Sequence, residues 1–308
     1  MTDLFEVKQK VEDSLLKMKG VVGVGLASMS PERLTIYVEN QETAKKIPLV
    51  LLGTETRTII TRVPKFQIER NKKTRPALPG ISIGHKSTTA GTFGFVVLDK
   101  NTKQRLILTN NHVAANFNRA ALEDHIYQPG PFDGGTEDDT IGILLKYREV
   151  TSDNNLIDGA VVRPDNDSDI FDEILGIGKV SGAEEARPEM TLRKSGRTSG
   201  ITGGTVLDIN ATIAIDGAPF GRTVFRDQIV TTAMAFPGDS GSVSVSENNR
   251  AVGLISAGSD TITIHNKIRN VARLLNVDII GDIDIDMPQA AFPTIPVAAA
   301  IGLGLLVM

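Results

Sequence analysis

The chain has 308 residues, about twice the roughly 150 residues of a typical domain, so its length predicts two domains or one large and one small domain. With 41% hydrophobic and 23% charged residues, the composition is that of a globular protein and excludes a disordered or fibrous one. The net charge of −4, without a long basic run, argues against nucleic acid as a partner, and the lack of cysteine excludes disulfides, thiolate zinc sites and cysteine nucleophiles.

Residues 1–63 have the pattern of a small α+β domain. Residues 4–18 place apolar side chains at three- and four-residue spacings, which predicts an amphipathic helix. Strands are predicted at 21–26, 33–38 and 56–63, and a short helix at 42–47. Because the first twenty residues lack the continuous apolar stretch of a secretory signal, we expect a cytoplasmic protein.

The second part of the chain is predicted to be mainly β. Residues 64–79 are basic, bounded by prolines and without periodicity, which predicts a solvated linker; the alternative is an exposed cleavage region at 70–75. From 80 to 286, short runs of Val, Ile, Leu and Thr alternate with turn residues, as in an antiparallel barrel or sandwich. The clearest strands are predicted at 92–98, 105–108, 140–150, 205–209 and 250–256, and a helix at 266–275.

Residues 287–308 form an uncharged tail that ends in an unbroken apolar run, 297–308. A membrane span needs about 20 apolar residues, more than this run supplies. We therefore expect the tail to pack on this protein or on a partner. Contact with a membrane and a disordered or processed tail are the alternatives.

A serine between glycines is the first candidate for chemistry. Ser240 lies in residues 237–242, PGDSGS, where the glycines allow a sharp turn and leave room for a substrate carbonyl. A serine hydroxyl becomes a nucleophile only when a base removes its proton, and that base is usually an imidazole. Among the four histidines, His112 is the best candidate because it lies at the end of the apolar strand predicted at 105–108, whereas His85, His125 and His265 lie in contexts that read as turns or exposed positions.

A buried acid would complete such a site by orienting the imidazole. Asp158 fits because it lies in the apolar stretch LIDGAVV, residues 156–162. Asp153, five residues earlier in a polar loop, is the alternative acid.

These three motifs together resemble those of the chymotrypsin-like serine peptidases. LTNNHV, LIDGAVV and PGDSGSVSV occur in the order of that family, and the intervals of 46 and 82 residues suit a pair of β-barrels that share the site. Residues 194–200, KSGRTSG, are also similar to a segment of its bacterial members. The resemblance covers about residues 80–280 and implies a chymotrypsin-like double β-barrel behind a small N-terminal α+β domain.

The resemblance also implies roles for individual residues. Ser240 would attack the carbonyl, His112 would act as general base and then acid, and Asp158 would orient His112. The backbone N–H groups of Gly238 and Ser240 would form the oxyanion hole. No metal or organic cofactor is implied.

The family's primary specificity pocket corresponds here to Met234, Ser256 and Gly258. Because Met234 carries no charge, we expect a preference for an apolar or small substrate residue over Arg or Lys. Asp260 lies close enough in sequence to reverse this expectation.

The chain departs from the animal digestive members because it lacks an Ile-Val-Gly-Gly activation site. In those members a freed N-terminal amine pairs with the acid before the serine, here Asp239. Asp239 therefore needs another partner, or a cut in the linker must supply one.

Two other polar stretches are given structural interpretations. The acidic residues of 165–173 lack the glycine and glutamate positions of an EF-hand, so a solvated loop is expected. Residues 128–135, QPGPFDGG, are rich in turn formers and are expected only to connect strands.

The sequence as a whole predicts a serine endopeptidase that acts on protein or peptide substrates. The alternatives are a catalytically inactive, peptidase-like binding module and a peptidase that cleaves only itself. A further hypothesis is that the tail occupies the cleft and restrains activity.

Overall fold

The computed structural model describes residues 4–26, 33–61, 63, 69–87 and 90–281. They belong to two compact units, Met1–Ile68 and Glu69–Met308. In this part of the chain no helix is both long and apolar enough to span a bilayer. The tail 287–308, with the packing, membrane contact and cleft binding considered for it, lies outside the described residues.

The first unit is a four-stranded sheet with two helices, in strand order β1-β2-β4-β3. Its elements are α1 (Leu4–Leu16), β1 (Val21–Leu26), β2 (Leu34–Val38), α2 (Gln41–Lys46), β3 (Val50–Leu51) and β4 (Thr54–Ile60). Along α1, the side chains of Val7, Val11 and Leu15 are buried in a core shared with the sheet. The elements predicted here are present, with ends within about three residues of the predicted ones. The sequence does not predict β3, because two residues are too few to show a period.

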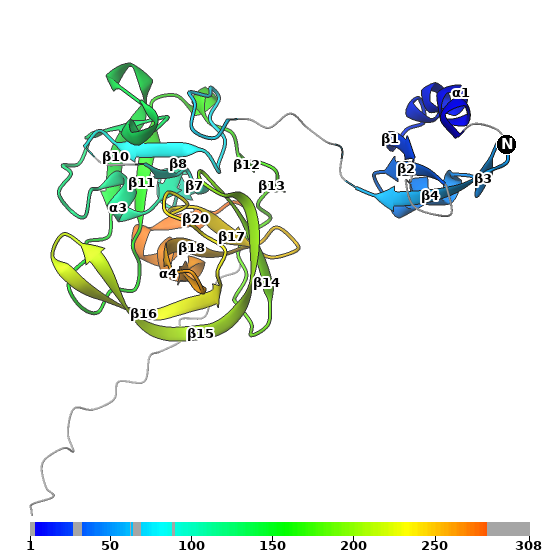
Figure 1. Cartoon of the computed structure of the whole chain (residues 1–308). Helices are drawn as coiled ribbons and strands as arrows, with labels where there is room; N and C mark the ends of the chain where they lie inside the picture. The colour runs from blue at the N-terminus through cyan, green and yellow to red at the C-terminus, as the bar shows by residue number, and fades with distance from the viewer. Residues whose placement is uncertain (1–3, 27–32, 62, 64–68, 88–89, 282–308) are drawn as a thin grey trace, which may run out of the picture. The chain divides into compact units, whose positions relative to one another are not determined.

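The second unit consists of two β-structures, coloured mostly cyan to green and yellow-green to orange in Figure 1. The first is an eight-stranded sheet in the order β20-β7-β8-β11-β10-β9-β5-β6. In chain order its strands are β5 (Ser82–His85), β6 (Gly91–Thr92), β7 (Phe95–Asp99), β8 (Arg105–Thr109), β9 (His125–Tyr127), β10 (Thr140–Tyr147), β11 (Ala160–Pro164) and β20 (Val277–Ile279). A small separate sheet pairs β12 (Glu173–Ile174) with β13 (Gly178–Lys179).

The second β-structure is a closed barrel of six strands, ordered β14-β15-β16-β19-β18-β17. Its strands are β14 (Thr191–Gly196), β15 (Gly200–Ala218), β16 (Gly221–Thr232), β17 (Val243–Val245), β18 (Ala251–Gly258) and β19 (Ile262–Lys267). β15 and β16 form a long hairpin that ends at the pair Ala218–Gly221 (Figure 1). The sequence predicts only residues 205–209 of this hairpin as a strand.

One apolar core joins the two β-structures. It contains Phe95 and Leu108 from the sheet, Val243 and Leu254 from the barrel, and one face of α4 (Ile268–Leu275). The sequence correctly predicts this helix at 266–275. Because the two structures share a buried core, loops from each are held in fixed positions where they meet.

The second unit begins earlier than the sequence suggests. Arg70 Nη1 donates to Ser195 Oγ at 2.8 Å and to Gly80 O at 2.8 Å, and Arg75 donates to the carbonyl oxygens of Asp139 and Thr140. Burial lowers the pKa of both guanidinium groups despite neighbouring carboxylates. From Glu69 onward, the segment predicted as a solvated linker or exposed cleavage region is therefore bound to the second unit, because these arginines find carbonyl and hydroxyl acceptors there.

Candidate active site

His112 lies on the one-turn helix α3 (Asn111–Ala114), which directly follows β8. The sequence places it at the end of a strand, and the structure differs because the chain turns into a helix at Asn111. Val113 and Ala114 on the same helix are buried, whereas 21% of the His112 side chain remains exposed. The imidazole is thus fixed by a buried turn and still accessible.

Asp158 is bonded to this imidazole. Its Oδ2 lies 2.5 Å from His112 Nδ1, and its Oδ1 accepts the His112 backbone N–H at 3.1 Å. Burial alone lowers the pKa of His112, but the charge of Asp158 and its hydrogen bond outweigh burial and raise it above 6.5. Asp153, the alternative acid, has a side chain 63% exposed and pairs with Arg226 instead.

Groups from both halves of the unit hold the backbone of Asp158. Asn110 Nδ2 donates to Asp158 O at 2.6 Å, and the Asp158 N–H donates to Asn266 Oδ1 on β19 at 2.9 Å. Asn266 Nδ2 in turn donates to Gln228 Oε1 on β16 at 2.7 Å. Since all three amide side chains are on fully buried residues, this network fixes the acid relative to the barrel.

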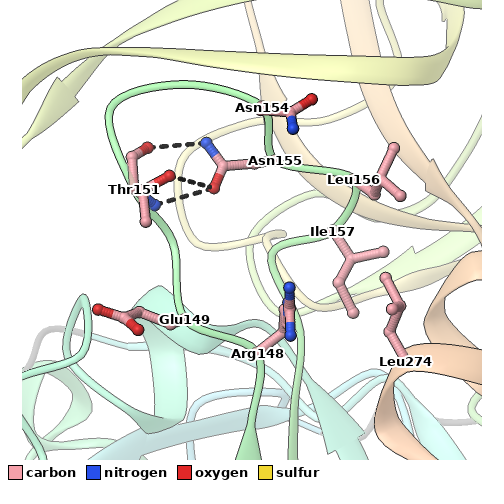
Figure 2. Close-up of a pocket in the computed structure, with 8 residues that line it drawn as sticks. All are labelled: Arg148, Glu149, Thr151, Asn154, Asn155, Leu156, Ile157 and Leu274. Carbon is pink, nitrogen blue, oxygen red and sulfur yellow. Dashed lines mark hydrogen bonds between the residues drawn. The ribbon is translucent and has the colours of Figure 1, made fainter. Parts of the chain in front are cut away.

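The segment before Asp158 is also closed on itself, as Figure 2 shows. Asn155 Oδ1 accepts the Thr151 N–H at 2.8 Å and its Nδ2 donates to Thr151 O at 2.7 Å. The Asn155 N–H also donates to Val224 O on β16 at 3.1 Å. A cavity of about 320 Å³ lies against this segment and is also lined by Arg148 and Leu274 (Figure 2).

Ser240 lies in the loop between β16 and β17, which packs against the first β-structure. Its carbonyl accepts the Thr92 N–H at 2.8 Å. Gly91 lies between the His112 motif and the Ser240 motif. There is no room for a side chain at this position, because a Cβ would lie 2.3 Å from Val113 and 3.0 Å from Ser240 O. The serine loop and the residue after His112 thus meet at Gly91. Among the described residues, no hydrogen bond joins the Ser240 hydroxyl to His112.

Asp239 has the alternative partner that the sequence requires. Its Oδ2 accepts from Lys194 Nζ at 2.9 Å and from Ser199 Oγ at 2.5 Å, and both ends of the ion pair are fully buried. Desolvation opposes ionisation of Asp239, but Ser199 and Lys194 outweigh it and lower the pKa of the carboxyl. Lys194 belongs to the segment 194–200 that the sequence singles out, although nothing in the sequence pairs it with Asp239.

A second cavity, of about 180 Å³, lies beside the His112–Asp158 pair. It is lined by Phe117, by the hairpin residues Ile215–Ala218 and by Ser256 and Ala257 on β18. The Phe117 ring stacks on His112 with centroids 5.5 Å apart, and Phe220 at the hairpin end contacts Phe117 edge-on at 6.3 Å. Neither phenylalanine is singled out by the sequence, because the contacts depend on the position of the hairpin.

The three residues predicted to line a specificity pocket lie in different surroundings. Ser256 lines the cavity beside His112. Met234 is 2% exposed and packs in a cluster with Leu192 and Val206 inside the barrel, and Gly258 is exposed at the end of β18. The structure therefore places Met234 in the core, and contact of any of the three with a substrate stays a prediction.

Two histidines expected in turns or exposed positions are buried in strands. His265 on β19 is fully buried between Ser244 Oγ and Thr231 Oγ1, and desolvation lowers its pKa to about 3. His85 on β5 is 3% exposed, with its Nε2 3.1 Å from Asp124 Oδ2. Within the described ranges, no three His, Cys, Asp or Glu side chains gather as metal ligands would.

Comparison with known proteins supports this architecture. The family model Trypsin matches residues 82–277, and no curated protein matches the chain. Three similar solved structures are a Nocardiopsis protease (21% identity, TM-score 0.51), protease A of Thermobifida fusca (20%, 0.50) and a glutamic acid specific serine protease (22%, 0.51). Each alignment covers 66% of this chain, and 97%, 98% and 100% of those chains respectively.

At these identities the solved structures establish the fold alone, and they confirm the predicted mainly β, chymotrypsin-like architecture. The family model matches more than half of the chain, over the residues that hold the His112 and Ser240 motifs. The chain therefore belongs to the trypsin family of serine proteases.

Proposed function

We propose that the chain is a serine endopeptidase with Ser240 as nucleophile, His112 as general base and Asp158 as the orienting acid. The observation that carries the proposal is the bond between His112 Nδ1 and Asp158 Oδ2, which leaves Nε2 to act on a hydroxyl. The packing of the Ser240 loop next to the residue after His112 supports the same assignment.

The reaction would proceed by acyl transfer. As Ser240 Oγ bonds to the substrate carbonyl carbon, its proton passes to His112 Nε2, and the carbonyl oxygen becomes an oxyanion. The imidazolium then protonates the leaving amine, and the C–N bond breaks. Water repeats the sequence on the acyl-enzyme, which releases the acid and restores Ser240.

Activity is proposed to require no cut in the chain. In the animal members that the sequence resembles, a new N-terminal amine pairs with the acid before the serine. Here Lys194 supplies an ammonium group to Asp239 from within the barrel. The loop that carries Ser240 is therefore ordered in the uncleaved chain.

The preferred substrate is proposed to present an apolar residue near the scissile bond. The cavity beside His112 is bordered by Phe117, Ile215 and Phe225, and its one carboxylate besides Asp158 belongs to the exposed Asp216. An apolar side chain gains free energy on entering such a site, whereas a charged one loses hydration.

Labelling by a fluorophosphonate probe, combined with hydrolysis of a denatured protein substrate, tests the proposal. The unmodified chain should be labelled and should hydrolyse the substrate, whereas Ser240→Ala and His112→Ala should do neither. Ser168→Ala is the matched control, because Ser168 is exposed in the loop of residues 165–169. Labelling and hydrolysis by this control should equal those of the unmodified chain.

Other outcomes would point to the alternatives. A folded chain that is never labelled would be a peptidase-like binding module. A chain that is labelled, hydrolyses no added substrate and shows a Ser240-dependent loss of intact mass would cleave only itself. Hydrolysis that persists in Ser240→Ala would overturn the proposed nucleophile.

A further inference from the structure

The two peptide groups that precede the proposed oxyanion-hole donors are both held by their carbonyl oxygens. Pro237 O accepts Thr198 Oγ1 at 2.8 Å, and Asp239 O accepts Ser242 Oγ at 2.6 Å. In a trans peptide the N–H points away from the carbonyl oxygen, so these bonds also set the directions of the Gly238 and Ser240 N–H groups. Neither N–H donates to any residue in the described part of the chain.

Gly238 is held on its other side as well. Its carbonyl oxygen accepts Thr92 Oγ1 at 2.9 Å, and Thr92 is fully buried in β6 of the first β-structure. The fit is close, because a Cβ on Gly238, where φ is +97°, would lie 2.4 Å from Thr198 Oγ1. Two threonine hydroxyls, one from each β-structure, thus fix the peptide planes on either side of Gly238.

Arg197 determines the direction of both hydroxyl bonds. Its backbone N–H donates to Thr92 Oγ1 at 3.0 Å, and its Nη1 donates to Thr198 Oγ1 at 3.0 Å. Arginine N–H groups can only donate, and each hydroxyl has a single proton. Each threonine therefore accepts from Arg197 and uses its own proton for a carbonyl oxygen of the Ser240 loop.

Arg197 is itself anchored to the other half of the unit. Its Nε donates to Asp133 Oδ2 at 2.8 Å, its Nη2 pairs with Asp133 Oδ1, and its guanidinium lies 5.1 Å from the centre of the Phe132 ring. The Asp133 side chain is 4% exposed and also accepts Ser82 Oγ at 2.6 Å. Asp133 lies in the stretch 128–135, to which the sequence analysis gives no role beyond a connection.

We infer that Arg197 is a positioning residue for the oxyanion hole. Held by Asp133, its guanidinium orients Thr198, whose bond to Pro237 O directs the Gly238 N–H toward the developing oxyanion. Its backbone N–H orients Thr92, which holds the next peptide plane through Gly238 O. The inference rests on the proposed function, since an oxyanion forms only if Ser240 attacks a carbonyl. It links the geometry of the hole to an ion pair between the two β-structures.

The test separates binding of the substrate from stabilisation of the transition state. Thr198→Val keeps the shape but removes the hydroxyl, and Thr198→Ser restores it. Loss of a whole oxyanion donor lowers kcat by about 10²–10³-fold, so a misdirected donor should lower it by about 10–100-fold while KM changes less than about twofold. The affinity for a peptide aldehyde, whose adduct places an oxyanion in the hole, should fall in parallel.

Arg197→Met should give the same pattern, and Thr198→Ser should recover most of kcat. The matched controls are the exposed Thr191→Val and Arg187→Met, for which no change is expected. A merely structural role would lower the melting temperature or raise KM without a selective loss of aldehyde affinity, and that result would overturn the inference.

The inference and the proposed function fail in different ways. If the unmodified chain is inactive, or if Ser240→Ala stays active, the proposed function is wrong. If the unmodified chain depends on Ser240 but Thr198→Val keeps kcat and aldehyde affinity, the inference alone is wrong. A crystal structure of Thr198→Val provides a measurement independent of activity: the Pro237–Gly238 peptide plane should rotate, and an unchanged plane would contradict the inference.

Discussion

A single carboxylate sets the electrostatics of His112. Desolvation lowers the pKa of the imidazole, and Asp158 at 2.5 Å reverses this effect and raises the pKa above 6.5. A general base must be neutral before it can accept a proton. We therefore expect kcat/KM to rise with pH as His112 loses its proton, with an apparent pKa above 6.5.

Asp158→Asn removes the charge that raises this pKa. Burial then dominates, so the acid limb of the pH profile should move below 6.5, while kcat should fall by roughly 10³–10⁴-fold because the imidazole is no longer held in the productive tautomer. Measuring kcat/KM between pH 5 and 9 tests both expectations. Asp153→Asn is the matched control, since this acid is exposed and should leave the profile unchanged. An acid limb that stays above 6.5 in Asp158→Asn would contradict the explanation.

The residues of the site differ in how far the sequence determines them. His112, Asp158 and Ser240 lie in motifs with distinctive neighbours and a fixed order, so they could be selected before the fold was known. Lys194 and Arg197 could not be assigned partners, because each pairs with an acid more than 40 residues away. Such pairs depend on the closure of the barrel and leave no local pattern.

At the scale of elements, the turn after α3 carries backbone strain beside the site. Asn116, Phe117 and Asn118 have φ values of 48°, 54° and 68°, a left-handed conformation that asparagine adopts readily but that costs other residues, here Phe117, roughly 1–2 kcal/mol. Asn118 stabilises the turn: its Oδ1 accepts Asn111 Nδ2 at 2.7 Å, and its Nδ2 donates to Val150 O at 2.6 Å. The strained turn holds Phe117 against His112.

Replacing Asn118 should release this turn. Asn118→Gly removes the side-chain bonds but tolerates positive φ, so it should lower the free energy of unfolding by about 1–3 kcal/mol. Asn118→Ala should cost about 1 kcal/mol more, because alanine is strained at this φ. Urea unfolding of both variants measures the difference. Glu189→Ala, at an exposed position with φ of 63°, is the control: it keeps the same backbone strain, so it should change stability by about 0.5 kcal/mol or less. Equal losses for the Gly and Ala variants would contradict the strain argument.

Elements with a strong local period are also those that the sequence predicts well. α1 and α4 each bury one face, at the spacings that identify them. The β15–β16 hairpin is predicted only over residues 205–209, because most of its residues beyond that point are partly or fully exposed and lack a strict alternation of apolar and polar side chains. The hairpin lines the cavity beside His112, so the shape of this cavity could not be predicted, although the residues proposed to react could be named from their motifs.

At the scale of the whole molecule, the boundary between the two units is set by contacts rather than composition. Residues 69–79 read as a linker because they are basic and lack periodicity. However, the Ser82 N–H donates to Arg70 O at 2.7 Å, and Ala77 exchanges backbone hydrogen bonds with Asp169 and Phe171. The segment therefore completes the second unit, and Arg70 reaches Ser195, next to Lys194, within the barrel.

Two truncated chains test this boundary. A chain that starts at Glu69 should fold and keep the melting temperature of the second unit, together with any peptidase activity. A chain that starts at Gly80 loses the bonds of Arg70 and Arg75, and hydrogen bonds to charged groups are worth about 1.5–3 kcal/mol each. A net loss of roughly 3 kcal/mol corresponds to a melting temperature lower by about 6–12 °C for a unit of this size.

Substitutions in the Glu69 chain separate the arginine contacts from mere chain length. Arg70→Met should reproduce part of the loss, because it leaves Ser195 Oγ and the carbonyl of Gly196 without their cationic donor. Lys72→Met should not, since Lys72 is exposed. Equal melting temperatures for the two truncated chains would mean that residues 69–79 are dispensable, and the unit would then begin at Gly80 as the composition indicates. A loss confined to the Gly80 chain and to Arg70→Met would show that partly buried arginines, in a segment that reads as solvated, help to hold the barrel that carries Ser240.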